Sequence, residues 1–345
     1  MNDRNSISQF EVIRQLRFPM IVLVTFAHSY SGVEEGFSLL TSDWNTYEFL
    51  KLLVSQTLVK VAVPVFFIIS GYLFFANVDQ WSVQVYKQKI LRRIWTLLIP
   101  YLLWNILMTF KLQTLSLGVF WDFWCPAGIQ IDWLGHEQWM SAPANMPLWF
   151  LRDLIVVSLF TPIIYIGARQ FGNWLLLPLS IIYLSGICAF TPGFSAYAVF
   201  FFTFGACLSI RKLNLLDVFR RYEWPAYVGS LICILSMLFS YHTELFSSVM
   251  LCFRVTGAVA VFCLTYRILS VTRRRIPTVV VDSTYFIYLA HFVFFFSVVD
   301  TTFFSLFGSS VVSLSVHYIL CPLLKIIIFV SIYVVYRWFK DYCRC

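Results

Sequence analysis

The chain has 345 residues, of which 60% are hydrophobic, 19% are aromatic and only 12% are charged. Soluble domains carry about 25% charged residues, so this composition excludes an ordinary soluble protein. A formal net charge of +8 would suit nucleic acid. The basic residues, however, lie between apolar runs, where orientation in a membrane explains them better.

Apolar runs of membrane-spanning length follow one another along the whole chain. A helix needs about 20 apolar residues to cross the hydrocarbon core, and the runs predict about ten such helices. We place these helices at residues 16–33, 58–76, 92–111, 147–167, 173–190, 196–210, 223–241, 246–269, 279–299 and 312–337. The predicted fold is one all-α membrane bundle over residues 1–345, without a soluble domain. We expect lone prolines (Pro64, Pro100 and Pro162) to be tolerated inside spans, and the first run to be retained rather than cleaved as a signal peptide.

Charges in the predicted loops alternate in sign along the chain. One set of loops and both chain ends collect most Lys and Arg residues: Arg4, Arg14, Arg17, Lys87, Lys89, Arg92, Arg93, Arg169, Arg211, Lys212, Arg220, Arg221, Arg267, Arg273, Arg274, Arg275, Arg337, Lys340 and Arg344. The other set is mainly acidic, with Lys51 and Lys111 near span ends. By the positive-inside rule, this alternation predicts that both termini are cytoplasmic.

Two of the predicted outer loops are long, near residues 34–57 and 112–146. The second combines Trp with acidic and histidine residues: Trp121, Asp122, Trp124, Asp132, Trp133, His136, Glu137 and Trp139. Indole faces beside carboxylates suit sugar binding, but an interfacial aromatic belt on a re-entrant loop explains the same residues. Nine cysteines form no framework. Cys125 alone falls in an outer loop, so we expect no intramolecular disulfide there, and no metal-ligand spacing is present.

The first predicted span carries two ionisable residues on one face. His28 follows Arg17 by eleven residues, which on a helix is about 16 Å of rise and roughly 20° of rotation. Arg17 would lie at the cytoplasmic edge and His28 near mid-membrane. An ionisable residue at that depth is a functional candidate. The alternative is a structural histidine beside an arginine that only sets topology.

Other charged or ionisable residues also fall within predicted spans: Arg152 and Asp153 in the fourth, Arg254 in the eighth, His291 in the ninth and Lys325 in the tenth. Adjacent helix positions do not face each other. We therefore expect Arg152 to face a polar cavity and Asp153 to meet another partner. Together these residues predict a polar path through the bundle, which an enzyme and a transporter would both need.

A basic cluster opens the third span, where Arg92 and Arg93 follow Lys89. Positive charge at this point helps to set membrane topology. Binding a phosphate group would be an added role, for which the guanidinium fork is well suited.

Five short motifs, in order, resemble those of acyltransferase family 3, the bacterial integral membrane O-acyltransferases. They are Arg17 with His28; Phe66-Phe67-Ile68-Ile69-Ser70-Gly71; the basic helix entry at Arg92 and Arg93 that ends in Pro100-Tyr101; Leu148 to Arg152; and Tyr288-Leu289-Ala290-His291. The chain departs from the family pattern at Phe18-Pro19, where a Gly is common. Many members also carry an Arg-x-Arg motif shortly after the Ser-Gly pair, whereas this chain has Ala76-Asn77 there.

The resemblance implies an enzyme of the bacterial cytoplasmic (inner) membrane. It would move an acetyl or other short acyl group from cytoplasmic acyl-CoA, as donor substrate without a permanent cofactor, to a hydroxyl of an extracytoplasmic or lipid-linked glycan. His28 and Arg152 would be catalytic, and Arg17 with Arg92 or Arg93 would hold the phosphates of CoA. Trp149, His291 and Arg254 are further candidates for substrate contact. The alternative is an exporter of a glycan or lipid-linked sugar that uses the same polar path.

Overall fold

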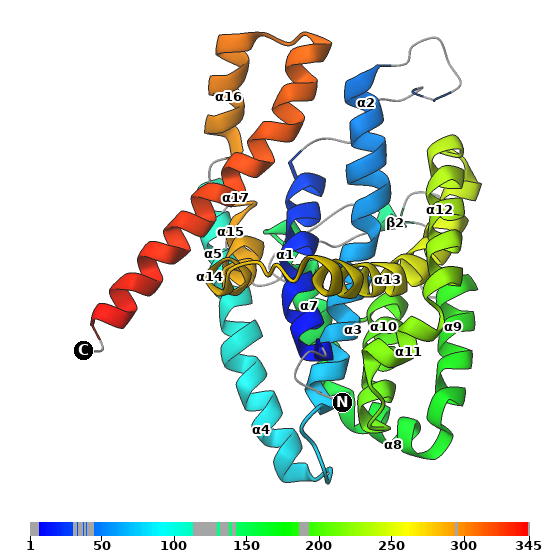
Figure 1. Cartoon of the computed structure of the whole chain (residues 1–345). Helices are drawn as coiled ribbons and strands as arrows, with labels where there is room; N and C mark the ends of the chain where they lie inside the picture. The colour runs from blue at the N-terminus through cyan, green and yellow to red at the C-terminus, as the bar shows by residue number, and fades with distance from the viewer. Residues whose placement is uncertain are drawn as a thin grey trace. The chain divides into compact units, whose positions relative to one another are not determined.

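The computed structural model describes residues 7–29, 33, 37, 39, 45–112, 130–131, 138–139, 143–185, 193–293 and 296–343. Helices make up almost all of these residues (Figure 1). Among the described residues the exception is a two-residue ladder in which β1 (Gln130–Ile131) pairs antiparallel with β2 (Gln138–Trp139). The structure therefore confirms an all-helical architecture. The chain divides into two units, Met1–Ala62 with Tyr222–Cys345, and Val63–Arg221.

The first unit is built around α1 (Gln9–Ala27). Its other elements are α2 (Thr46–Leu50), the π-helical η2 (Lys51–Thr57), the 3₁₀ turn η3 (Leu58–Val61), α12 (Glu223–Phe239), α13 (Glu244–Thr272), α14 (Thr278–Asp282), α15 (Thr284–Ala290), α16 (Phe296–Phe307) and α17 (Val311–Tyr342). Helix α1 contacts η2, η3, α13, α14, α15 and α17. The buried face of α1 carries Ile13, Leu16 and Ile21, which explains why this helix lies at the centre of the unit.

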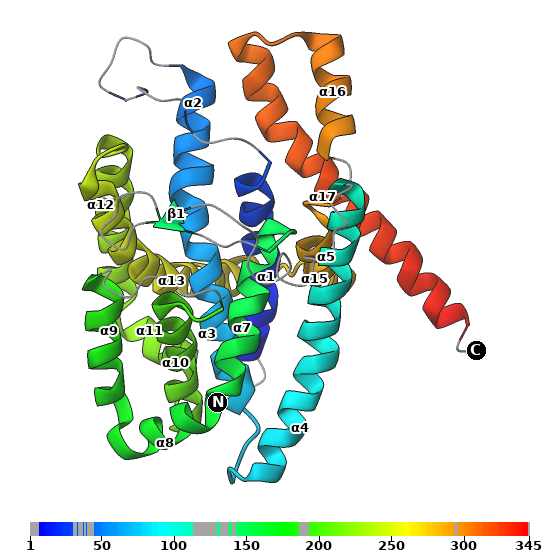
Figure 2. The same cartoon turned by 180° about the vertical axis from the view of Figure 1, so that it is seen from behind.

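The second unit is built around α10 (Ala196–Ile210), which contacts α7, α8, α9 and α11 (Figure 2). Its elements are α3 (Ala62–Phe75), α4 (Val83–Arg93), the π-helical η4 (Ile94–Leu98), α5 (Ile99–Leu112), η5 (Met146–Leu148), α7 (Trp149–Leu159), α8 (Thr161–Phe171), η6 (Gly172–Leu175), α9 (Leu176–Ser185), α10 and α11 (Leu215–Arg221). Buried aromatic side chains, among them Phe67, Phe201 and Phe202, form its core.

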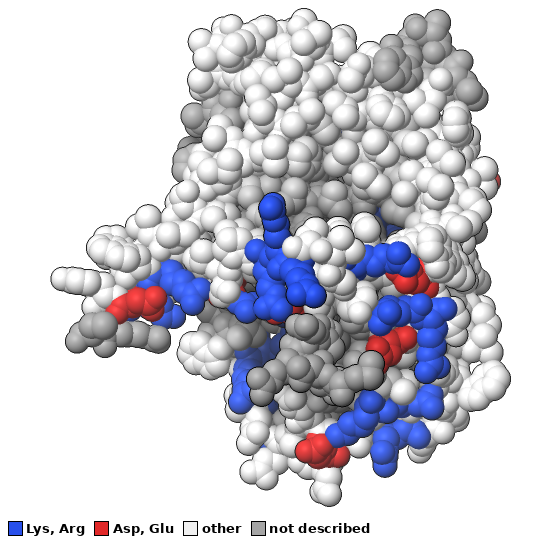
Figure 3. All heavy atoms as spheres, in the orientation of Figure 1, with Lys and Arg blue, Asp and Glu red and all other residues white. Residues whose placement is uncertain are grey.

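The outward faces of several helices are apolar, as expected for a protein surrounded by lipid. Large exposed side chains include Trp95, Ile181, Leu231, Ile232, Val335 and Trp338. Figure 3 shows Lys and Arg gathered in groups close to one another, and a wide surface outside these groups that carries almost no charged side chains.

Four helical stretches in the described part of the chain are long and apolar enough to cross a membrane: Thr46–Phe75, Val83–Phe110, Glu244–Thr272 and Val311–Tyr342. Two bent pairs raise this to six if each pair is one span. The chain is thus a multi-pass membrane protein. The count of ten spans, the sidedness of the termini and the single domain stay predictions.

Prolines explain where helices break and where they continue. Pro64 and Pro100 lie inside continuous helices, each preceded by a 3₁₀ or π-helical stretch that contains the carbonyl four residues back. Pro162, by contrast, is at the start of α8, and the chain bends by 63° after Leu159. The predicted span 147–167 is therefore divided between α7 and α8, because α7 ends first and a proline favours the first turn of a new helix.

Two further predicted boundaries are also wrong. Helix α1 begins at Gln9 and ends at Ala27 instead of covering 16–33. The predicted span 279–299 is divided among α14, α15 and α16. The six described cysteines that the structure records as free include Cys207 and Cys321, whereas Cys125 and most of the aromatic outer-loop residues, from Trp121 to Glu137, lie outside the described residues.

Candidate active site

Helix α1 holds Arg17 and His28 three turns apart. Ser8 caps its start, with its side chain accepting a hydrogen bond from the Glu11 amide at 3.2 Å. His28 is the cap residue just beyond Ala27, and its amide donates to the Val24 carbonyl at 3.2 Å. Arg17 is half-buried and interacts electrostatically with Asp282. His28 faces His291. Arg17 is thus within electrostatic range of α14, and His28 lies beside the residue that directly follows α15.

Two histidines from distant parts of the sequence meet at this point. The ring centroids of His28 and His291 are 5.5 Å apart, and the ring planes are inclined by 48°. Phe292 packs edge-on to His28, with centroids 6.0 Å apart. His291 is 2% exposed. The ring of His28 therefore packs against other side chains in the interior of the first unit.

Cationic side chains surround the histidine pair. Lys60 of η3 interacts electrostatically with His28, Arg254 of α13 with Lys60, and Lys325 of α17 with His291. Lys325 is 1% exposed. Lys60 and Lys325 therefore place positive charge within electrostatic range of the two imidazoles. Such a field favours negative charge that develops during a reaction.

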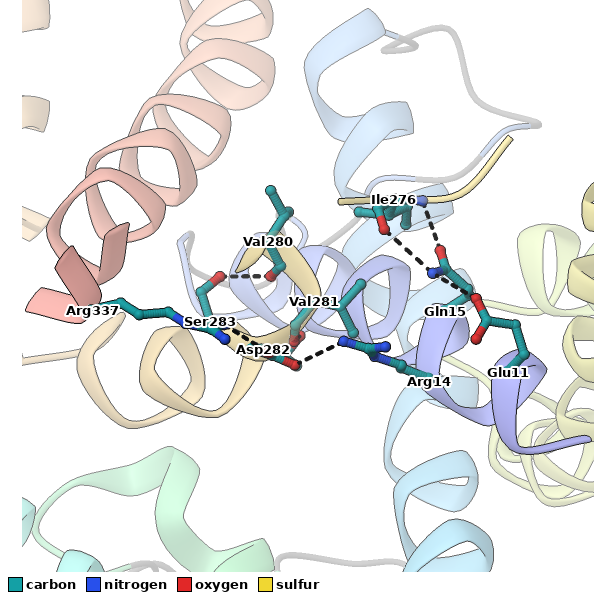
Figure 4. A network of polar contacts seen from close by, with 10 residues as sticks. Glu11, Arg14, Gln15, Ile276, Val280, Val281, Asp282, Ser283 and Arg337 are labelled. Atoms are coloured by element: carbon teal, nitrogen blue, oxygen red, sulfur yellow. Dashed lines mark hydrogen bonds and ion pairs between the residues drawn. The ribbon is translucent and has the colours of Figure 1, made fainter. Parts of the chain in front are cut away.

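A polar network ties the start of α1 to two other helices (Figure 4). The carboxylate of Asp282 in α14 contacts Arg14 of α1 at 3.5 Å and Arg337 of α17 at 2.8 Å. Gln15 donates to the Ile276 carbonyl and accepts from the Ile276 amide. Arg17 lies one turn beyond Arg14, so this network fixes the helix that carries it.

A second polar group in the first unit connects η2 with α17. The hydroxyls of Ser55 and Tyr318 are 2.7 Å apart, and Ser55 also donates to the Phe26 carbonyl at 3.2 Å. In the preceding turns, the buried side chains of Glu48 and Lys51 form an ion pair of 2.6 Å. Sequence reasoning does not single out these residues, because one Lys and one Glu near a span end resemble loop charges.

Arg152 and Asp153 of α7 form an ion pair in the second unit. The Nε and Nη2 atoms of Arg152 are each 3.3 Å from Oδ1 of Asp153. Both side chains are buried, and Ser195 donates a hydrogen bond to Oδ2 of Asp153 at 2.7 Å. The two neighbouring side chains therefore pair with each other, which was not expected, while Asp153 also meets another partner, Ser195, as expected. A long guanidinium can bend back to its neighbour where burial makes an unpaired charge costly.

Polar residues around this pair organise the start of α7. The Asn105 side chain donates to the Tyr101 carbonyl at 2.8 Å and accepts from the Asn145 amide at 2.9 Å. Asn105 and Asn145 are both fully buried. Trp149 packs near Tyr197, with ring centroids 6.3 Å apart. Only Trp149 of these residues was a sequence candidate, because buried asparagines leave no clear periodic pattern.

The basic cluster at the end of α4 places its two arginines differently. Arg92, with Lys89 and Gln88, lines a cavity of about 340 Å³. The guanidinium of Arg93 instead lies over the Phe74 ring, 5.4 Å from its centroid. Asp79 also lines this cavity and pairs with Lys212 at 2.5 Å, and the Lys212 ammonium lowers the pKa of that carboxyl. Arg92 is therefore the better placed of the two to bind an anion.

The predicted site residues thus fall into two groups. The first unit contains Arg17, His28, Arg254 and His291, and the second contains Arg92, Arg93, Trp149 and Arg152. Chemically, the first group combines an interior base with positive charge. The second offers an anion-binding cavity and a buried Arg–Asp pair.

Comparison with known proteins points to one family. A family described as "Acyltransferase domain" (acyltransferase family 3) matches residues 11–337. The chain is also 26% identical over 181 residues to the succinoglycan biosynthesis protein ExoH of Rhizobium meliloti (strain 1021). This similarity covers 48% of the chain and 45% of that relative, so the matched part spans less than half of the relative's length. No solved structure matches. Because the family match covers nearly the whole chain, the protein belongs to acyltransferase family 3.

Proposed function

We propose that this protein is an O-acyltransferase that moves an acetyl or other short acyl group from acyl-CoA to a hydroxyl of a cell-surface polysaccharide or its lipid-linked precursor. Family membership supports acyl transfer, and the name of the succinoglycan biosynthesis relative supports a polysaccharide acceptor. The observation that carries the proposal is the ring of His28, at the end of α1 and facing His291 beside buried cations.

In this reaction His28 acts as general base. It removes the proton of the acceptor hydroxyl as the oxygen attacks the thioester carbonyl carbon. A C–O bond forms, the C–S bond breaks, and the proton passes to the leaving thiolate to give CoA and an ester. Imidazole suits this role because its reference pKa of about 6.5 leaves it largely neutral near pH 7. The positive charges of Lys60 and Lys325 favour the oxyanion that develops on the thioester oxygen.

The donor enters from the cytoplasmic side in this proposal, in agreement with the predicted topology. Arg17 of the first unit and Arg92 of the second are each proposed to bind phosphate oxygens of CoA, because a guanidinium matches the geometry of a phosphate group. Arg152 helps to orient substrate through its guanidinium, and Trp149 and Arg254 contribute contacts. The acceptor reaches the site from the extracytoplasmic side or as a lipid-linked sugar.

The test uses purified full-length protein in detergent or nanodiscs with acetyl-CoA and an isolated polysaccharide acceptor. Acceptor-dependent release of CoA thiol, together with an ester-linked acyl group on the glycan detected by mass spectrometry, would support the proposal. His28→Ala should lower the rate by at least about 100-fold while the protein still elutes as a single species. Unchanged acylation by that variant would rule out His28 as the base, and glycan movement without thioester cleavage would indicate an exporter.

A further inference from the structure

The hydrogen bonds of His291 fix the state of its ring. Its Nδ1 atom is 2.8 Å from the Tyr288 carbonyl oxygen and 3.2 Å from the Ile287 carbonyl oxygen. Carbonyl oxygens only accept hydrogen bonds, so Nδ1 must carry the proton. In the neutral ring, Nε2 is then left with a lone pair. Because helix α15 supplies both carbonyls, the local fold itself selects this tautomer.

The lone pair of His291 is buried and has no hydrogen-bond partner among the described residues. A buried acceptor without a partner is costly, and such an atom in a native protein calls for an explanation. A histidine with only a structural role is expected to form hydrogen bonds through both ring nitrogens. A histidine that acts together with another group needs one ring nitrogen available for that group.

The imidazole ring beside His291 is that of His28. Two imidazoles joined by an N–H···N hydrogen bond have ring centroids about 5 Å apart, given a nitrogen–nitrogen distance of about 2.9 Å. The observed separation of 5.5 Å is only slightly larger. Hydrogen bonds of catalytic groups are often long without substrate and shorten when it binds.

We propose that His291 is a positioning residue for the reaction: its Nε2 atom accepts a hydrogen bond from one ring nitrogen of His28, so that the other nitrogen of His28 is the base. The hydroxyl proton passes to the basic nitrogen of His28 and then to the leaving thiolate. The N–H on the other nitrogen of His28 donates to Nε2 of His291, and the Nδ1–H of His291 donates to the two carbonyls, so that these hydrogen bonds orient the base without transferring a proton. This relation parallels the way in which a third group orients the histidine of a serine hydrolase triad. It deepens the proposed function and rests on it.

The charged and titratable groups facing the pair come from three elements besides α1 and α15. They are Lys60 of η3, Arg254 of α13, which interacts with Lys60, and Lys325 of α17. Tyr288 of α15 also packs near the His291 ring, with centroids 6.3 Å apart. Lys60, Arg254 and Lys325 are cations and supply no acceptor, whereas His291 offers its Nε2 lone pair beside the His28 ring.

The experiment compares two substitutions that each keep half of the His291 hydrogen bonding. His291→Asn places an amide near Nδ1, keeps a donor to the two carbonyls and removes the acceptor at Nε2. His291→Gln reaches the Nε2 position with an amide oxygen that can accept from His28. We expect the Asn variant to lose about 10- to 100-fold in kcat with little change in KM for acetyl-CoA, the size found for partners that orient metal-bound histidines. The Gln variant should stay within about 10-fold of wild type.

A double variant, His28→Ala with His291→Asn, should be no slower than His28→Ala alone, because His291 acts only through His28. Melting temperature and elution profile are followed for every variant. The proposal is overturned if the Asn variant keeps more than half of the wild-type kcat. It is also overturned if the Asn and Gln variants lose activity equally and in step with stability. If wild-type protein transfers no acyl group, the proposed function itself fails, and the two failures are thereby distinguished.

Discussion

Gly71 of α3 and Gly205 of α10 lie where the backbones of these two helices touch. A Cβ atom at Gly71 would overlap the Phe202 carbonyl oxygen, and one at Gly205 would overlap the Ile68 carbonyl oxygen. Small residues allow membrane helices to approach closely. The Ser70-Gly71 end of the family motif is thus explained by packing within the second unit.

Substituting either glycine should destabilise the protein. Gly71→Ala and Gly205→Ala each insert a methyl group against backbone atoms that cannot move aside, at an expected cost of about 1–3 kcal/mol. Melting temperature in detergent, followed by intrinsic fluorescence, checks this. Gly167→Ala is the matched control, because its Cβ would meet only the flexible Leu175 side chain at 3.1 Å. A control that loses as much stability as the two variants would contradict the packing explanation.

The Arg152–Asp153 pair predicts an asymmetric response to mutation. Arg152→Ala leaves the Asp153 carboxylate buried with Ser195 but without its guanidinium, and should cost about 3–5 kcal/mol. The double variant Arg152→Ala with Asp153→Ala removes both charges and should recover part of this loss. Thermal unfolding of the purified variants measures the difference. Equal destabilisation by the single and double variants would show that the pair is not what stabilises α7.

Arg92 and Arg93 should affect donor binding unequally. Arg92 lines the cavity beside Lys89, and a charge-assisted hydrogen bond to phosphate is worth about 1.5–3 kcal/mol. We therefore expect Arg92→Ala to raise the KM for acetyl-CoA by about 10- to 100-fold with a smaller change in kcat. Arg93→Ala loses its position over Phe74 and should mainly affect stability, by about 0.5–1 kcal/mol. The reverse pattern in steady-state kinetics would exchange the two roles.

Two ion pairs of nearly equal length should contribute differently to stability, because one is buried and the other is exposed. Glu48 and Lys51 are 2.6 Å apart with side chains 5% exposed, whereas Asp79 and Lys212 are 2.5 Å apart with side chains 92% and 61% exposed. Lys51→Met leaves a buried carboxylate and should lower the free energy of unfolding by about 3–5 kcal/mol. A clear fall in the melting temperature would report this loss. Lys212→Met should change it little, because water screens exposed charges. Similar shifts for both variants would contradict this account.

The exposed pair also has a predictable pH dependence. Lys212 lowers the pKa of Asp79 in the folded protein. The contact is therefore fully present at neutral pH and is lost only as the pH falls through this lowered value. Carbon-13 NMR of labelled aspartate carboxyls in wild type and in Lys212→Met would check the direction, since the variant should titrate at higher pH.

Sequence reasoning located the helices because long apolar runs have few alternatives to a helix in lipid. The predicted boundaries were wrong at particular helix ends, where local hydrogen bonding determines the end of the helix. Pro162 lies in the first turn of a new helix, and α1 begins at Gln9, seven residues before the predicted start, and ends at Ala27. Both helix ends depend on backbone hydrogen bonding, which hydropathy does not measure.

The sequence indicates candidate site residues one by one but not their arrangement. Helical spacing predicts that Arg17 and His28 share one side, because Arg17 lies in α1 and His28 directly follows its last residue. Nothing in the sequence could show that His28 meets His291, since they are separated by 263 residues. Lys60 was missed for a similar reason. A lysine at the edge of an apolar run resembles a topology signal until the packing of η3 against α13 is known.

Helix α1 sets both the distance and the relative direction between the Arg17 guanidinium and the His28 imidazole, because a fixed number of residues separates them. Adding one residue between Arg17 and His28 would turn the ring by about 100° and advance it by only 1.5 Å. The histidine would then face a different neighbour while hardly changing its depth. A one-residue insertion in this helix would therefore leave the depth of the His28 ring almost unchanged but would alter the direction in which the ring points.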